Sequence, residues 1–139
     1  MRVLALDHGR ARCGCAMSDP TGTLVRPLAA IARPDSGDGI EAIARLVARH
    51  RPAEIVVGLP LLESGSEGSQ AAAARAFAGR LSAIVEPPVR LHDERYTTRQ
   101  ARDSRAFGAS AEIDSLAAAH LLEAYLQSLA ARRSGDGGR

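Results

Sequence analysis

Residues 3–17 read VLALDHGRARCGCAM, and this stretch decides the fold. The apolar run from Val3 to Leu6 predicts a buried strand that ends at Asp7. A glycine-containing turn follows, and the run from Cys13 to Met17 predicts a second strand. Because so few residues connect them, the two strands are expected to pair antiparallel. The sequence therefore opens with a hairpin that carries an acidic residue beside its bend.

Three further strands are expected along the chain. Residues 24–31 predict a third antiparallel strand, and Pro27 favours a place at the edge of the sheet. Residues 54–58 and 89–93 predict two more strands, each separated from the previous one by a helical segment. These features indicate an α/β fold whose mixed five-stranded sheet has three antiparallel strands followed by two parallel ones.

Helices are predicted from the spacing of apolar residues and from capping residues. Residues 40–51 and 70–81 fit two helices, and a third begins at residue 97 or 98 and runs to about 107. A final, largely apolar helix is expected from about 113 to 132. We expect one domain over residues 1–133, with helices flanking the sheet, and a flexible tail over residues 134–139.

Composition limits the classes of protein that remain. The chain has 139 residues, 45% of them hydrophobic, which is typical of a globular domain with a real core. It has no run of about 18 apolar residues, so we expect no membrane span. Asp7 comes too early for a signal peptide, which predicts a cytoplasmic protein. Cys13 and Cys15 would face one side of a strand, where core packing is expected and redox sensing is the alternative.

All 18 basic residues are arginine, and the net charge is only +2. The planar guanidinium suits phosphate groups, which weakly favours nucleic-acid binding. A GC-rich genome would also replace Lys by Arg, and the composition does not separate these two explanations.

Four acidic residues lie where a sheet would bring side chains together. Asp7 ends the first strand, Asp93 and Glu94 end the last strand, and Asp114 lies in the first turn of the final helix. Strand ends and helix starts share a rim of such a sheet. Converging carboxylates repel one another unless a cation lies between them, and oxygen ligands suit Mg²⁺ or Mn²⁺. The alternatives are a polar strand end, a helix cap and an exposed ion cluster.

Several basic or glycine-containing segments could contact phosphates. Arg95, Arg99 and Arg102 fall on one side of a helix, and the segment 9–12 could bring Arg10 and Arg12 to an anion, although a plain turn explains it as well. Residues 65–69 could offer backbone amides to an anion, with Ser66 or Ser69 as a cap in the alternative interpretation. His92 and His120 have no partner at metal-ligand spacing. No Walker A or dinucleotide motif occurs.

Five collinear segments of the chain resemble the YqgF/RuvX family over about residues 2–128. They are 4–19, 55–60, 65–68 with Phe77-Ala78, 93–95 with Thr97-Thr98, and 113–118. The resemblance implies an RNase H-like domain with metal-binding carboxylates at Asp7, Glu94 and Asp114. It also implies a nuclease that matures the 5′ end of pre-16S rRNA. The family was earlier described as Holliday junction resolvases, by similarity to RuvC enzymes.

Two departures from the family pattern stand out. Family members usually have Ile and Val at positions 13 and 15, which favours core packing of both thiols. A basic residue commonly precedes the last motif, whereas residues 109–112 here end in Glu112. That difference argues against a phosphate contact from this segment, which Arg102 or Arg105 could supply instead.

The leading hypothesis is phosphodiester hydrolysis with one or two Mg²⁺ or Mn²⁺ ions. The predicted phosphate contacts are with Arg10, Arg12, Arg95, Arg99 and Arg102. A second hypothesis is a homodimer that resolves four-way DNA junctions, since cutting two strands needs two sites. A third is a nucleic-acid-binding factor without catalysis, whose binding would persist in EDTA. An actin-like ATP-binding domain shares the Asp-x-Gly start but needs a second lobe. Whether the substrate is RNA or DNA, and whether the protein is a monomer or a homodimer, stay open.

Overall fold

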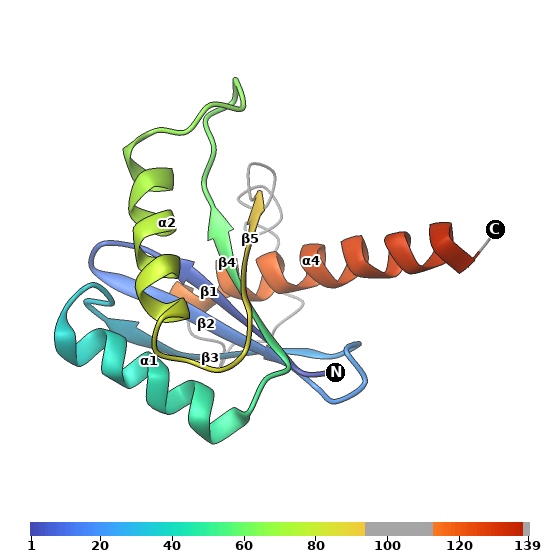
Figure 1. Cartoon of the computed structure of the whole chain (residues 1–139), viewed down its shortest axis with the longest axis horizontal. Helices are drawn as coiled ribbons and strands as arrows, with labels where there is room; N and C mark the ends of the chain where they lie inside the picture. The colour runs from blue at the N-terminus through green and yellow to red at the C-terminus, as the bar shows by residue number, and fades with distance from the viewer. Residues whose placement is uncertain (94–112, 138–139) are drawn as a thin grey trace.

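The computed structural model describes residues 1–93 and 113–137, with side chains described over 1–93 and 115–133. A five-stranded sheet has two helices on one face and one long helix on the other (Figure 1). The elements in chain order are β1 (Val3–His8), β2 (Arg12–Ser18), β3 (Val25–Ala32), α1 (Gly37–His50), β4 (Glu54–Leu59), α2 (Ser69–Ser82), β5 (Val89–Asp93) and α4 (Ile113–Gly137).

The strands lie in the order β3-β2-β1-β4-β5. β1 pairs antiparallel with β2, with Leu6 opposite Cys15 and Asp7 opposite Gly14. β3 adds antiparallel to β2, while β4 runs parallel to β1 and β5 runs parallel to β4. The predicted mixed sheet is therefore confirmed, including the edge position of the strand that contains Pro27. The carboxyl ends of β1, β4 and β5 all lie at one end of the sheet.

Alternation along β1 sends its side chains into two separate cores. Leu4 and Leu6 pack with α1 and α2, in the cluster that contains Ile43 and Phe77. Val3 and Ala5 pack against α4 on the other face. Both faces of β1 are thus buried, which explains its continuous apolar run.

Each helix has a recognisable reason for where it begins or ends. Ser36 caps α1, because its Oγ accepts a hydrogen bond from the Gly39 N–H at 3.0 Å. α1 ends at His50, and its C-cap residue, Arg51, adopts a left-handed conformation before Pro52. The predicted serine cap of α2 is wrong: the N-cap is Gly68, and no side chain caps the helix. Glu67 instead pairs with Arg75 at 2.6 Å.

Cys13 and Cys15 are fully buried in the α1/α2 core, as core packing predicts. A hydrogen bond with Cys15, together with burial, raises the pKa of the Cys13 thiol well above its ordinary value. A thiol with a raised pKa is a poor nucleophile at neutral pH, which argues against a redox role.

The last helix is longer than the sequence predicts. α4 continues to Gly137 and extends past the sheet (Figure 1), so residues 134–137, expected in a loose tail, are helical. Glycine lowers helix propensity by about 1 kcal/mol per residue without forbidding a helix. The predicted helix at 97–107 lies outside the described residues. Over the described residues, no helix has the length and apolar character that crossing a bilayer requires.

Candidate active site

Asp7 lies near the carboxyl end of β1 and points to the face that α4 covers. It follows Val3 and Ala5 at intervals of two residues, and both of those contact the α4 core. Gly14 lies directly opposite on β2, and Gly58 is the next residue of β4 after the Leu6–Val57 pair. Because both of these neighbours are glycines, the positions beside Asp7 on β2 and β4 carry no side chain that could cover its carboxylate.

The end of β5 lies two strands away, at the same edge of the sheet. His92 pairs with Gly58, and its ring meets the Tyr125 ring of α4 edge-on at 5.6 Å, so His92 points to the α4 face. Burial lowers the pKa of His92 despite the opposing charge of Asp93, and the imidazole is therefore neutral at pH 7. Strand alternation sends Asp93 to the opposite face, where Leu91 packs. Asp93 therefore does not share the face of Asp7.

The first turn of α4 is attached to the sheet beside Asp7. The Ser115 hydroxyl is fully buried and accepts a hydrogen bond from the Cys15 N–H at 3.0 Å. Cys15 pairs with Leu6, the residue before Asp7. Asp114 is the second residue of α4, directly before Ser115. The fold thus brings the start of α4 to the strand pair that carries Asp7, although 107 positions separate the two aspartates in the sequence.

A tight turn places two arginines just beyond Asp7. The Gly9 N–H donates to the Arg12 carbonyl at 2.9 Å, and Arg10 and Arg12 are both exposed. A Cβ on Gly9 would lie 2.8 Å from the Arg12 carbonyl oxygen, so this turn requires glycine. The predicted turn is therefore present, and it exposes the two arginines that the sequence predicts to contact phosphates. A cavity of about 460 Å³ lies between this turn and the start of α2, lined by Arg10, Ser69 and Gln70 among others.

His8 and Asp35 hold the end of β1 in place, and no local pattern in the sequence indicates this pair. The His8 side chain is only 4% exposed, and its Nε2 lies 2.9 Å from the Asp35 carboxylate. Its ring also packs on Phe77 with centroids 4.8 Å apart. The Asp35 carbonyl accepts a hydrogen bond from Arg80 at 2.9 Å. These contacts join the end of β1 to the loop before α1 and to α2. Twenty-seven positions separate His8 from Asp35, so local spacing gives no sign of the pair.

Several predicted site residues lie beyond what the structure describes. Glu94, Arg95, Arg99 and Arg102 fall outside the described residues, as does Arg105, and the side chain of Asp114 is not described. Among the described residues, no group of three or more His, Cys, Asp or Glu is arranged to hold a metal ion. Of the three predicted carboxylates, Asp7 is the one whose side chain is described.

Comparison with solved structures defines the class of fold. The chain is similar to the fowlpox virus resolvase in complex with Holliday junction DNA, with a TM-score of 0.59 and 15% identity over 93% of this chain and 99% of that one. It is also similar to Thermus thermophilus RuvC in complex with a Holliday junction substrate, with a TM-score of 0.57 and 16% identity over 93% and 96% of the two chains. The chain has the RNase H-like fold of RuvC-type resolvases.

Sequence comparison identifies the family. The protein-family model described as "RuvX: Holliday junction resolvase" matches residues 1–128 of this chain. The chain belongs to the RuvX family of resolvase-like nucleases, whose reaction class is phosphodiester hydrolysis.

Three similar relatives share one name, "Putative pre-16S rRNA nuclease". The protein of Rhodococcus erythropolis is 42% identical over 90% of this chain and 77% of its own length. The Mycobacterium ulcerans relative is 41% identical over 99% and 84% of the two chains. For Moorella thermoacetica the identity is 40%, over 93% and 96%. The resemblance seen in the five sequence motifs is therefore confirmed at the level of the family.

Proposed function

We propose that this protein is a metal-dependent nuclease that uses Asp7, Glu94 and Asp114 as catalytic, metal-binding carboxylates. The observation that carries the proposal is the attachment of the start of α4 beside Asp7, through the Cys15–Ser115 hydrogen bond. Asp7 also points to the face that α4 covers and has glycines on both neighbouring strands. Glu94 is preferred to Asp93 as the second ligand, because alternation directs Asp93 to the other face of the sheet.

The donor set fits a hard divalent cation. All three groups are carboxylates, which suit Mg²⁺ or Mn²⁺ rather than a soft metal. Such a cation supplies an activated water for attack on phosphorus and stabilises charge on the leaving oxygen. In this proposal, β1 positions the carboxylate oxygens of Asp7 to bind the cation. The His8–Asp35 contact keeps the end of that strand in place.

We further propose that the substrate is the 5′ leader of pre-16S rRNA, in the cytoplasm. The relatives that match most of this chain carry the name "Putative pre-16S rRNA nuclease", which supports pre-16S rRNA as the substrate. The exposed Arg10 and Arg12 lie just beyond Asp7, where they can neutralise backbone phosphates. Arg95, Arg99 and Arg102 complete the proposed phosphate contacts.

The decisive experiment compares carboxylate variants on three substrates in parallel: pre-16S leader RNA, unrelated single-stranded RNA and a four-way DNA junction, each with Mn²⁺ or Mg²⁺. Asp7→Asn, Glu94→Gln and Asp114→Asn should each reduce cleavage more than about a hundredfold. Changing a residue that only hydrogen-bonds to a metal ligand typically costs up to about a hundredfold in activity, and loss of a ligand itself should cost more. Asp93→Asn is the matched control and should retain activity. Circular dichroism confirms that each variant is folded.

The results separate the alternatives. Cleavage by Asp7→Asn at the wild-type rate would refute the site, and equal loss in Asp93→Asn would refute the choice of Glu94. RNA binding that persists in EDTA, without products on adding Mn²⁺, would favour a binding factor without catalysis.

The family description favours one second candidate, the resolution of four-way DNA junctions by a homodimer. It predicts symmetric nicks in the junction and a dimer in analytical ultracentrifugation. A monomer that cleaves only the leader RNA would exclude this candidate.

A further inference from the structure

A second group of arginines lies away from Asp7, on the residue before β1, on the edge strand β3 and on α1. Arg2 precedes β1, Arg26 lies on β3, and Arg45 and Arg49 lie on α1; we call these four residues the far-end arginine surface. Their side chains are all exposed. Arg2 is five residues from Asp7 along an extended strand, which separates the two by about 17 Å. One phosphate group therefore cannot contact both places.

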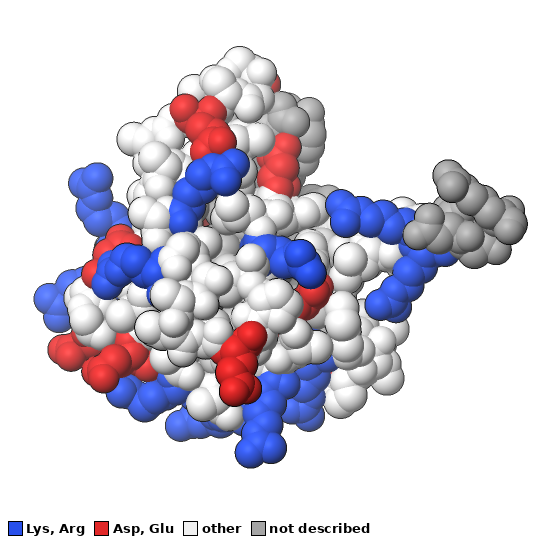
Figure 2. Space-filling model, viewed as in Figure 1, with Lys and Arg blue, Asp and Glu red and all other residues white. Residues whose placement is uncertain are grey.

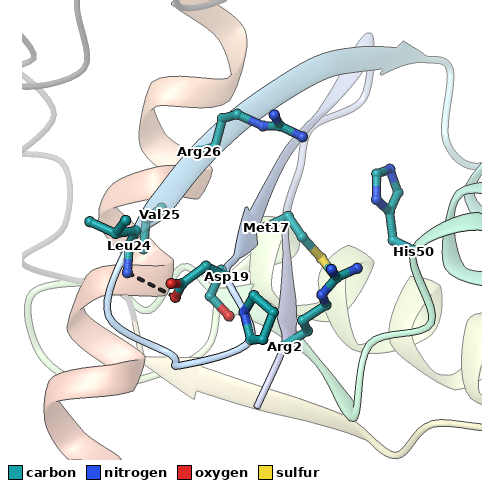
Figure 3. Close-up of a pocket in the computed structure, with 9 residues that line it drawn as sticks. Arg2, Met17, Asp19, Leu24, Val25, Arg26 and His50 are labelled. Carbon is teal, nitrogen blue, oxygen red and sulfur yellow. Dashed lines mark hydrogen bonds between the residues drawn. The ribbon is translucent and has the colours of Figure 1, made fainter.

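Two adjoining hollows connect these arginines. The first, about 370 Å³ in volume, is lined by Arg2, Arg26 and His50. Figure 3 shows these three side chains around it: Arg26 on β3, His50 at the end of α1, and Arg2 just before β1. The second, about 340 Å³, is lined by Arg45, Arg49 and the same His50, against residues 28–31 of β3. His50 thus joins the two hollows, and positive groups border both of them.

The nearest acidic residue on α1 is Glu41, one helical turn before Arg45. Over the described part of the chain, none of the four arginines forms an ion pair. Asp19 is the acidic residue among those lining the two hollows. Its carboxylate already accepts hydrogen bonds from the Thr21 hydroxyl at 2.7 Å and from the backbone N–H groups of Thr23 and Leu24 at 3.0 and 3.1 Å. Figure 2 shows blue side chains along the lower rim of the molecule, near the N-terminus and α1.

The electrostatic effect is visible at His50. Burial and the charges of Arg49, Arg26 and Arg2 together lower the pKa of its imidazole. Like charges held together without an anion are unfavourable, and a ligand that brings negative charge relieves the repulsion. Because the arginines are spread over two hollows rather than gathered around one point, an extended chain of phosphates fits them better than a single small anion.

We propose that the far-end arginine surface binds the sugar-phosphate backbone of the RNA substrate, at a distance from the bond that is cleaved. The identity of this ligand as substrate rests on the proposed function. Backbone contacts of this kind add affinity that depends on salt and do not read sequence. The far-end arginine surface would hold a long precursor RNA while the proposed site at Asp7 cleaves one phosphodiester bond.

Binding is tested in the full chain carrying Asp7→Asn, so that no cleavage interferes. The probe is labelled pre-16S leader RNA, followed by fluorescence anisotropy over a series of salt concentrations. The test variant is Arg45→Gln/Arg49→Gln. The matched control is Arg132→Gln/Arg133→Gln, which removes the same charge from exposed positions of α4.

Losing two phosphate contacts should weaken binding about tenfold in low salt and reduce the slope of log K against log salt by about 1.4. The control should change neither quantity. RNA should also raise the pKa of His50, measured by NMR titration, in the protein with the far-end arginines intact. With Asp7 restored, the test variant should raise KM for the leader RNA and leave kcat unchanged.

Equal loss in the test and control variants would show that only net charge matters and would overturn the inference. Unchanged RNA binding by the test variant would also overturn it, as would binding of these arginines to phosphatidylglycerol vesicles but not to RNA. Failure of the proposed function looks different, because RNA binding that depends on the far-end arginines can persist when no cleavage is found.

Discussion

Asp7 shows how much depends on the direction of one side chain. An aspartate at a strand end is common, but here alternation points it to the α4 face, with Gly14 and Gly58 on the strands beside it. The next residue, His8, points to the opposite face and is held by Asp35. Asp7 thus faces the proposed site, while the adjacent His8 holds the end of β1 through its contact with Asp35.

The turn after Asp7 gives a prediction at this scale. Gly9→Ala should lower the free energy of unfolding by about 1–3 kcal/mol, because the new Cβ would lie 2.8 Å from the Arg12 carbonyl oxygen and the backbone must move. Gly79→Ala, in α2, is the control: nothing lies within 4 Å of its Cβ, so it should stabilise by about 0.5–1 kcal/mol. Urea unfolding measures both changes. A neutral Gly9→Ala variant would contradict the required close approach.

At the scale of elements, α4 is the helix on which both the second core and the proposed site depend. Its apolar residues cover Val3, Ala5 and Val56, while Ser115 fixes its start. Further along, the Tyr125 hydroxyl donates to the buried Glu54 carboxylate at 2.6 Å, and Arg90 lies 3.6 Å from the same carboxylate. A polar contact inside this interface fixes where α4 lies on β4.

Removing that contact should be measurable. Tyr125→Phe leaves the Glu54 carboxylate without its closest donor, so the free energy of unfolding should fall by about 1–3 kcal/mol at pH 7. Burial and the bond to Glu54 raise the pKa of Tyr125 from 10.0 to about 12. The folded state therefore favours the neutral phenol: its contribution is complete below pH 10 and is lost as the pH rises to about 12.

Urea unfolding at neutral and alkaline pH tests both parts of this prediction. The difference in stability between wild type and Tyr125→Phe should shrink over that alkaline range. A difference that stays constant up to pH 12 would mean that the hydroxyl does not titrate as the fold requires. Glu54→Gln, which keeps an acceptor for the hydroxyl, should lose less stability than Tyr125→Phe.

For the whole molecule, the edge with the proposed site is separate from what holds the fold together. Both buried clusters are apolar and pack on the two faces of the sheet, and neither includes Asp7. A cation at the edge is therefore expected to serve catalysis rather than folding, unlike a structural zinc.

Chelation tests this separation. EDTA should abolish cleavage while the protein stays folded, because a cation at a few times its Kd adds only about 1 kcal/mol to stability. In calorimetry the unfolding midpoint should therefore fall by only about 2–8 °C. Returning Mn²⁺ should restore activity without a refolding step. Loss of the cooperative transition in EDTA would show that the metal is structural.

The sequence by itself determined the five strands, three of the helices and the mixed character of the sheet, with three antiparallel strands followed by two parallel ones. Apolar runs, short connections and turn residues predict β1 to β5 closely, because these signals are local. They also predict Asp7 at a strand end and an acidic residue in the first turn of α4. The misses are local as well: Gly68 replaces the predicted serine cap, and α4 passes through Gly135.

Only the tertiary structure decided which residues meet. Chain distance says nothing about the contacts of Ser115 with Cys15 or of His8 with Asp35. It also does not show that Arg2 and Arg26 line one hollow. These contacts depend on strand register and on which face each helix covers, and a shift of one residue would reverse every side chain. The fold therefore places the proposed carboxylate site and the far-end arginine surface at two separate places on the molecule.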